Sequence, residues 1–319
     1  MLHAEKLTPS LKEYIWGGDK LKTEWNKKPP ESFVKVAESF ELSCVPLSES
    51  FIAEGENKGK FLSQYIKEND GVLGGNCKRF PFFPLLIKLI DACDDLSVQV
   101  HPSDGFALMH EGQFGKTEAW YIADCNEGAS IFLGFNKKVS KDEVKTAAEN
   151  GTICGLLNRI PVKKGDFFFV PAGTVHALLS GVTVYEVQEN STITYRLYDY
   201  KRVDKSGKER ELHLDKALQV INTEKFTGTV AAEKTSELIN CNYFRLRRHF
   251  FSNNRESISF DTKGFSSFLS LTFLAGEAEL LSNGYVSKAQ KGDTYFVPYG
   301  AQVTITATQT DTEVLVACV

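Results

Sequence analysis

The chain has 319 residues, of which 42% are hydrophobic and 24% charged, a balance typical of a soluble globular protein with room for two domains. Its 37 basic and 41 acidic residues give a net charge of −4, which argues against partners such as nucleic acid or an anionic membrane surface. The sequence shows neither a membrane-spanning apolar run nor a signal peptide, and its seven cysteines are scattered singly without a C-x-x-C pair. These features predict a cytoplasmic protein with reduced thiols.

Short strands dominate the predicted secondary structure. Residues 1–35 are rich in turn signals, and residues 61–67 have helical spacing. The capping-box pattern Ser140-Lys-Asp-Glu143 predicts a helical insertion over about 140–157. A charged loop at 201–211 precedes a short helix near 214–221 and a second strand-rich segment from about residue 227. Strands are expected at 85–90, 96–101, 118–123, 130–135, 166–170, 175–179, 182–188 and 192–198.

An internal repeat predicts a duplicated domain. The segment Lys164-Gly-Asp-Phe-Phe-Phe-Val-Pro-Ala-Gly-Thr-Val-His176 is matched 127 positions later by Lys291-Gly-Asp-Thr-Tyr-Phe-Val-Pro-Tyr-Gly-Ala-Gln-Val303. Many short strands at this spacing favour a β-sandwich or jelly roll for each copy. We therefore expect a first domain over residues 1–225 and a second over 226–319. Because His176 becomes Val303, any chemistry that needs this histidine belongs to the first copy.

Polar and apolar side chains alternate along the stretch Leu96-Ser-Val-Gln-Val-His-Pro102. This period is that of a β-strand, with Ser97, Gln99 and His101 on one face. Such a polar face usually meets water. It would need another partner, such as a metal ion, if the strand lay inside a β-rich body.

Several motifs carry a resemblance to a known family. The turn Val170-Pro-Ala-Gly-Thr-Val-His-Ala177 and the doubled β-domain resemble the cupin superfamily. Leu96-Ser-Val-Gln-Val-His-Pro-Ser-Asp104, Gly115-Lys-Thr-Glu-Ala-Trp120 and Glu186-Val-Gln-Glu-Asn-Ser-Thr-Ile-Thr-Tyr-Arg-Leu-Tyr-Asp199 are similar to the type I mannose-6-phosphate isomerases, especially their short bacterial form. The similarity covers about the first 220 residues. It implies a mainly β fold of two cupin-type jelly rolls with a few short helices.

The resemblance also implies roles for particular residues. One zinc ion per chain would be bound by Gln99, His101, Glu118 and His176. The catalytic residues would be Arg196 and Lys116, and the phosphate of a sugar substrate would be bound by Lys88 and Ser97. The chain has Lys116-Thr-Glu118 where larger members of the family have Lys-Pro-Glu, which leaves the ligand intact. The chain is also too short to contain their extra helical domain. The resemblance therefore does not indicate which segment covers a bound sugar.

Structural roles are open for some of these residues. Lys88 lies in an apolar run, where it could extend its ammonium to a sheet edge instead of binding phosphate. Arg196 could form a structural ion pair with Asp199 or Glu186. Trp16 and Trp120 are expected to be packing residues.

The implied activity is the interconversion of mannose 6-phosphate and fructose 6-phosphate by proton transfer through an enediolate. This reaction needs a base, an electrophile near the sugar oxygens and a grip on the phosphate. Lys116, a zinc-bound water and a nearby carboxylate are all candidate bases, and we favour Lys116. The alternatives are a sugar-phosphate-binding or regulatory cupin without catalysis, and a different metal cupin such as an iron dioxygenase. The complete ligand set disfavours the first, and the Lys116 and Arg196 cations disfavour the second.

Overall fold

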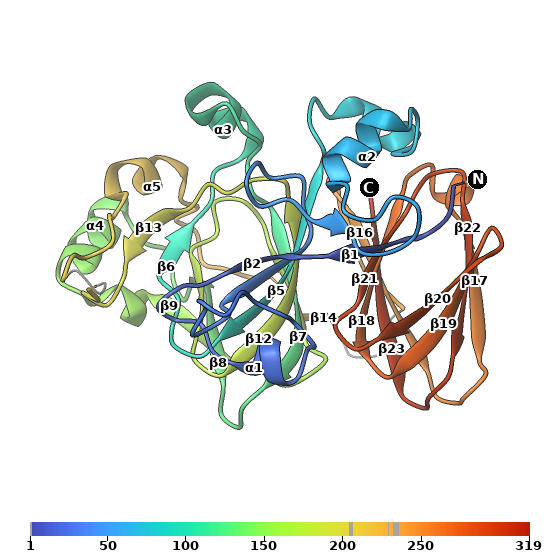
Figure 1. Cartoon of the computed structure of the whole chain (residues 1–319). Helices are drawn as coiled ribbons and strands as arrows, with labels where there is room; N and C mark the ends of the chain where they lie inside the picture. Colours follow the sequence, from blue (N-terminus) through green and yellow to red (C-terminus); the bar gives the residue numbers. More distant parts are fainter. Residues whose placement is uncertain (1, 204–206, 229, 232–235) are drawn as a thin grey trace.

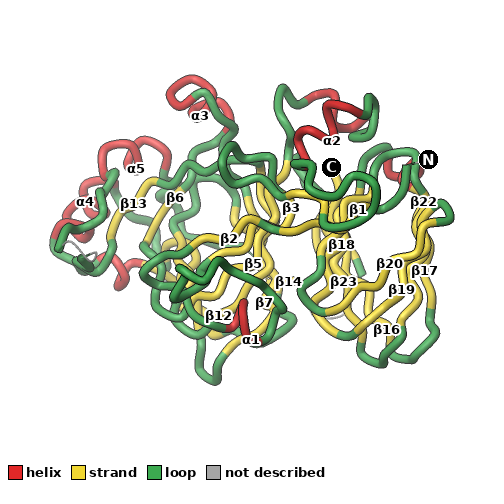
Figure 2. The backbone as a smooth tube through the Cα atoms, in the orientation of Figure 1, coloured by secondary structure: helices red, strands yellow, loops and turns green. Residues whose placement is uncertain are grey.

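The computed structural model describes residues 2–203, 207–228, 230–231 and 236–319, which form two β-sandwiches side by side (Figure 1). The first sandwich, in blue to yellow, lies on the left of the figure, and the second, mostly in orange to red but with the blue strand β1, lies on the right. Strands make up most of the regular structure of both, with a few short helices around the first (Figure 2). The predicted mainly β fold with two jelly rolls is confirmed.

Two antiparallel sheets build the first sandwich. Its strands are β2 (Ser10–Lys12), β3 (Glu38–Leu42), β5 (Leu85–Ala92), β6 (Val98–Val100), β7 (Glu118–Cys125), β8 (Ser130–Phe135), β9 (Leu157–Pro161), β10 (Phe167–Val170), β11 (His176–Leu178), β12 (Val182–Glu189), β13 (Tyr195–Tyr198) and β14 (Val230–Ala231). Sheet I has the order β14-β10-β7-β12-β5-β3-β2, and sheet II has the order β13-β6-β11-β8-β9.

Two further sheets build the second sandwich. Its strands are β1 (Glu5–Thr8), β4 (Phe51–Ile52), β15 (Glu237–Asn240), β16 (Arg245–Phe251), β17 (Ser257–Asp261), β18 (Leu269–Ala275), β19 (Glu277–Ser282), β20 (Tyr285–Gln290), β21 (Thr294–Val297), β22 (Gln302–Ala307) and β23 (Thr312–Cys318). Sheet III has the order β15-β16-β23-β18-β21-β1-β4, and sheet IV has the order β17-β22-β19-β20. Strands β1 and β4 come from the N-terminal part of the chain, so both parts build sheet III. The domain boundary at residue 225 stays a prediction.

The helices are short and lie at the ends and on the outside of the sheets. They are α1 (Lys20–Thr23), α2 (Leu62–Glu68), α3 (Asp104–Glu111), α4 (Lys141–Glu149) and α5 (Leu214–Val220), with 3-10 turns at Gly75–Arg79, Ile153–Leu156 and Thr262–Phe265. At the start of α4, the Ser140 hydroxyl accepts a hydrogen bond from the Glu143 N–H, as the capping-box pattern predicts. The helix ends earlier than the expected residue 157, because Gly151 turns the chain with φ of +74°.

Apolar clusters join these elements into layers. Helices α4 and α5 pack on the outer face of sheet II, and a second cluster fills the space between sheets II and I. The outer face of sheet I packs against sheet III through a cluster that both sandwiches share, and a last cluster lies between sheets III and IV. Sheet I is therefore covered on both faces, which is why every residue of β5 and β12 is buried.

The repeat seen in the sequence is also a structural repeat. Strands β10 and β21 occupy matching positions, and each is preceded by a glycine with positive φ, Gly165 and Gly292. The turns that follow contain Gly173 and Gly300 with φ of +87° and +93°. Only glycine adopts this conformation readily, which explains why the two copies share these residues.

Candidate metal centre and substrate pocket

The polar face of the stretch around β6 is buried. Ser97 and His101 are 3% and 1% exposed, and Gln99 is half-buried. The opposite face, with Val98 and Val100, packs into the cluster beneath α4 and α5. The alternating pattern therefore separates two buried environments, and a solvated polar face is excluded. These polar groups point toward sheet I, where they meet side chains from other strands.

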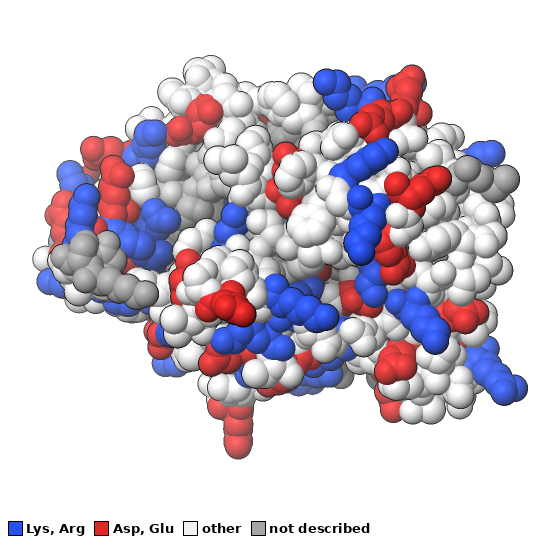
Figure 3. All heavy atoms as spheres, viewed as in Figure 1, with Lys and Arg blue, Asp and Glu red and all other residues white. Residues whose placement is uncertain are grey.

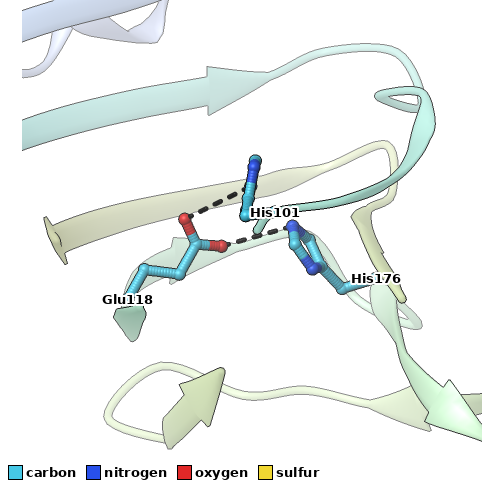
Figure 4. A group of neighbouring side chains, drawn as sticks. All are labelled: His101, Glu118 and His176. Atoms are coloured by element: carbon cyan, nitrogen blue, oxygen red, sulfur yellow. Dashed lines mark ion pairs between the residues drawn. The ribbon is translucent and has the colours of Figure 1, made fainter. Parts of the chain in front are cut away.

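His101, Glu118 and His176 meet in one cluster, in which their ligand atoms lie within 4.8 Å of one another (Figure 4). Glu118 Oε1 lies 3.3 Å from His176 Nε2, and Glu118 Oε2 lies 3.7 Å from His101 Nε2. Strand register produces this arrangement, since His176 pairs with Gln99 and Glu118 with Val170. The Gln99 amide completes the group, with Nε2 at 3.4 Å from His176 Nε2.

Backbone carbonyls orient both imidazoles. His101 Nδ1 donates to the Ile193 carbonyl at 2.7 Å, and His176 Nδ1 donates to the Thr174 carbonyl at 2.9 Å. A carbonyl can only accept, so each ring carries its proton on Nδ1 and turns the lone pair of Nε2 toward Glu118. Burial lowers the pKa of His101 well below its usual value and that of His176 to about 4, with Lys116 as a further cause. Both rings are therefore neutral at neutral pH.

These groups fit a divalent metal ion. Glu118 Oε1 is buried and has no hydrogen-bond partner among the described residues, while two nitrogen lone pairs point toward the same carboxylate. Without a cation between them, such electron-rich atoms would repel each other in a medium of low polarity. Imidazole nitrogen and carboxylate oxygen are common ligands of zinc and similar metals. In the described structure, the Lys116 ammonium supplies positive charge here, since it contacts Glu118 Oε2 and lies 3.3 Å from His101 Nε2.

A pocket opens beside this cluster. Five of the residues predicted to act at the site line it, namely Lys88, Ser97, Gln99, Lys116 and Arg196. The other three predicted residues, His101, Glu118 and His176, adjoin the pocket through their contacts with Lys116 and Gln99. The fold thus brings the whole predicted set together from β5, β6, β7, β11 and β13.

Two carboxylates that were not predicted as site residues lie at the base of the pocket. Glu186 Oε1 lies 3.3 Å from Lys88 Nζ and 3.7 Å from Lys116 Nζ, and Glu38 Oε2 lies 3.8 Å from Lys88 Nζ. Burial favours the neutral form of Glu186, but Lys116 and Lys88 outweigh it and lower its pKa to about 2. Burial raises the pKa of Glu38. Lys88 is therefore not an edge lysine extended toward solvent but a buried cation between two carboxylates.

Arginine side chains lie on the other side of the pocket, on and beyond β13. The suggested ion pair of Arg196 with Asp199 is wrong, because Asp199 binds Arg202 and Arg210 instead. Among the described residues, Arg196 has no ion-pair partner, and its buried Nε makes no hydrogen bond. Its guanidinium is therefore available to an anionic ligand in the pocket. On the face shown in Figure 3, acidic and basic side chains are interspersed, so the cationic character of the pocket is a local feature.

Comparison with known proteins identifies the family. Residues 4–132 match the family model "Phosphomannose isomerase type I, catalytic domain". The chain is 40% identical over 300 residues to the mannose-6-phosphate isomerase ManA of Bacillus subtilis, covering 92% of each chain. It is 38% identical over 309 residues to the probable mannose-6-phosphate isomerase GmuF of the same organism, covering 93% of this chain and 94% of the relative. The chain belongs to the type I phosphomannose isomerase family.

The similarity to this isomerase family extends through both sandwiches. The crystal structure of the mannose 6-phosphate isomerase from Bacillus subtilis matches with a TM-score of 0.86 at 34% identity and covers 100% of both chains. A putative mannosephosphate isomerase from Archaeoglobus fulgidus has the same fold, with a TM-score of 0.76 at 22% identity. The resemblance noted over the first 220 residues is therefore wider than the motifs indicated. No helix in the described ranges is long and apolar enough to cross a membrane.

Sequence reasoning missed several pocket residues of this isomerase. Glu38, Glu186, Tyr14 and Arg210 all line the pocket. A charge at the centre of an apolar strand was the available signal for Glu186, which lies in the run Val182-Thr-Val-Tyr-Glu-Val187. Trp16 and Trp120 are buried as expected of packing residues, yet both also line the pocket, and Trp120 Nε1 donates to Glu186 Oε2 at 3.0 Å.

Proposed function

We propose that this protein interconverts mannose 6-phosphate and fructose 6-phosphate with one zinc ion bound by Gln99, His101, Glu118 and His176. One observation carries the proposal: a buried group of two neutral histidines and a carboxylate adjoins a pocket lined by lysine and arginine side chains. The names of the Bacillus relatives, which cover nearly the whole chain, point to the same substrate.

The reaction moves a carbonyl group between C1 and C2 of the sugar. A proton leaves the carbon beside the carbonyl, an enediolate forms, and a proton returns to the neighbouring carbon. A zinc ion at this site would supply a Lewis acid that stabilises negative charge on the sugar oxygens. The imidazoles are already neutral and oriented by backbone carbonyls, so little rearrangement is needed to bind a metal.

Lys116 is the proposed base. Its Nζ is buried where the candidate metal cluster meets the pocket and lies 3.7 Å from Glu186 Oε1, so it adjoins both the proposed zinc ligands and a carboxylate of the pocket. Arg196, which has no ion pair within the described residues, would then offset negative charge that develops on the substrate. The role of Arg196 uses positive charge held in place before the substrate arrives, whereas Lys116 has to give up a proton before it can act as a base.

Ser97 and Lys88 are the proposed phosphate ligands. Ser97 shares the polar face of Gln99 and His101, and Lys88 lies on the facing sheet. The carboxylates beside Lys88 compete with phosphate for its ammonium, so substitution of this residue is informative. A Lys88→Met variant with a KM raised about tenfold and a nearly unchanged kcat supports phosphate binding. A fall in kcat of similar size would instead indicate that Lys88 acts through its contacts with Glu38 and Glu186.

A coupled assay for fructose 6-phosphate formed from mannose 6-phosphate tests the proposal. We expect turnover that a chelator abolishes and zinc restores, together with exchange of the sugar C2 hydrogen with solvent deuterium. Binding of mannose 6-phosphate without any turnover would instead favour the non-catalytic sugar-phosphate-binding cupin. Turnover that persists after complete removal of metal would contradict the metal assignment.

We also place this activity in the cytoplasm. All seven cysteines are free. Cys77 is buried in the cluster that both sandwiches share, and Cys318 is buried in the cluster between sheets III and IV. Free thiols in these positions are compatible with a reducing compartment. Fractionation of the source cells tests this location.

A further inference from the structure

Lys116 lies in a short irregular segment, Gly115–Thr117, that connects the loop after α3 to the start of β7. The segment is fully buried but has no place in a strand ladder, so its N–H groups need other acceptors. The Lys116 N–H bonds the Pro102 carbonyl at 3.0 Å. Side-chain carboxylates accept from the residues on either side of Lys116.

Those carboxylates belong to Asp104 and Glu189. The Gly115 N–H donates to Asp104 Oδ1 at 2.8 Å, and the Thr117 N–H donates to Glu189 Oε1 at 2.7 Å. The Glu189 backbone N–H returns a bond to the Thr117 carbonyl at 3.1 Å. A Cβ at Gly115 would lie only 2.5 Å from the Asp104 nitrogen, so the loop and the start of α3 are in direct contact. The Lys116 backbone is thus fixed from two sides.

The two carboxyl groups also interact with each other. Glu189 is 2% exposed, and its Oε2 has no hydrogen-bond donor among the described residues. Burial, with the Asp104 charge as a further cause, raises the pKa of Glu189 to about 8. Glu189 therefore holds a proton at neutral pH.

We propose that Asp104 and Glu189 are positioning residues that hold the Gly115–Thr117 segment so that Lys116 is directed into the pocket. We call this pair of carboxyl groups the clamp. The inference rests on the proposed function, because it gives the clamp a role in proton transfer by Lys116. The other titratable groups that face the pair are Tyr243 and Cys241, which belong to the second sandwich. Both carboxylates lie within motifs that resemble the family, but neither of them was assigned a role from the sequence.

The first test replaces Glu189 with leucine, which removes the acceptor for the Thr117 N–H. A small displacement of Lys116 should lower kcat about 10- to 100-fold while the KM changes less than about threefold and the zinc content stays unchanged. The control is Glu5→Leu, because Glu5 is equally buried at 2% but lies in β1 of sheet III. This control should lose stability without losing kcat.

The second test replaces Glu189 with glutamine, whose amide oxygen accepts from the Thr117 N–H and whose NH₂ group stays uncharged at every pH. We expect kcat within about twofold of the wild type at pH 7. As the pH rises through about 8, Glu189 of the wild type should lose its proton, and its charge should repel that of Asp104. The kcat of the wild type should then fall, and that of Glu189→Gln should not.

Three outcomes would overturn the positioning role. The first is an unchanged kcat in Glu189→Leu, and the second is an equal fall in kcat in Glu5→Leu. The third is the same fall in kcat above about pH 8 in the wild type and in Glu189→Gln. Amide hydrogen exchange of residues 115–117 provides a readout that does not need activity, and exchange should be faster in Glu189→Leu alone. If the leucine variant does not fold, the pH profiles of wild type and Glu189→Gln decide. A wild-type protein without turnover but with these exchange differences would overturn the proposed function and leave the clamp itself supported.

Discussion

The two sandwiches have the same strand order, but among the described residues only the first contains the candidate metal centre. The order β10-β7-β12-β5 in sheet I matches β21-β18-β23-β16 in sheet III, and β6-β11-β8-β9 matches β17-β22-β19-β20. Register then identifies the equivalent residues. Val170 pairs with Glu118, as Val297 pairs with Leu269, and His176 pairs with Gln99, as Val303 pairs with Phe260.

The second sandwich therefore has apolar side chains at three of the four positions where the first has its proposed ligands. Leu269, Val303 and Phe260 are all buried in the cluster between sheets III and IV. The same backbone frame holds a set of candidate metal ligands in one copy and a mostly apolar core in the other. The comparison shows that strand register supplies the geometry and that residue type alone decides whether it becomes a site.

The second sandwich contributes support to the first. Sheet III packs against the outer face of sheet I, which contains β5, β7 and β12 of the pocket wall. At this interface, Glu313 from β23 accepts hydrogen bonds from the Tyr121 hydroxyl and from Arg248 Nε. The pocket wall is thus backed by a second protein layer and excluded from solvent.

The largest expected effect comes from giving the first sandwich the residue of the second. His176→Val should abolish zinc binding and lower kcat/KM about 1,000-fold or more, because the ligand set is broken. Metal analysis and the coupled assay measure both effects. The matched control, Val303→Ala, should keep one zinc per chain and full activity while losing about 2 kcal/mol of stability. Retained zinc in His176→Val would contradict the ligand assignment.

Next in size is the loss of the proposed base. Lys116→Met keeps much of the side-chain volume but removes the amine, and kcat should fall about 100- to 10,000-fold with zinc still bound. Lys164→Met, at an exposed lysine of the repeated segment, makes the same change of charge and should leave kcat unaltered. Steady-state kinetics and metal analysis of both variants measure these effects. A fully active Lys116→Met would transfer the role of base to another group such as Glu186.

A smaller effect is expected at the interface between the sandwiches. Glu313→Gln removes the charge that Arg248 and Tyr121 share, and the free energy of unfolding should fall by about 1–3 kcal/mol. Chemical denaturation measures this change, and kcat at saturating substrate should stay within about twofold. Glu279→Gln, at an exposed position of β19, is the control and should alter neither quantity. An unaffected stability in Glu313→Gln would show that this contact does not support the first sandwich.

The smallest expected effect is a pH dependence of the metal-free protein. Burial keeps the pKa of His176 in the folded state, about 4, below that of the unfolded chain, about 6.5. Below pH 6.5 the unfolded chain binds protons that the folded state does not, so stability should fall as the pH drops toward 4. His176→Val should have a shallower slope in denaturation experiments between pH 7 and 5. Equal slopes would mean that this imidazole is not buried without metal.

Some structural features were predictable because they depend on local pattern or on repetition. The alternation around Gln99 predicted a strand, and the segment around His176 and Val303 predicted a duplication. Helix α3 was missed, although Ser103 before it and Gly112 after it are ordinary helix start and stop signals. The sequence pattern predicted strands at 96–101 and 118–123 and no helix between them.

The sequence by itself determined the β-rich fold, the two copies and, through its resemblance to a family, the residues expected to act together. Only the tertiary structure decided that the polar face of β6 is buried, that Lys88 lies between Glu38 and Glu186, and that Asp104 and Glu189 hold the Lys116 segment. The physical reason is that periodicity records which side chains share a face of one strand. Which groups from distant strands meet across that face, and how their charges shift one another, depends on how the sheets pack.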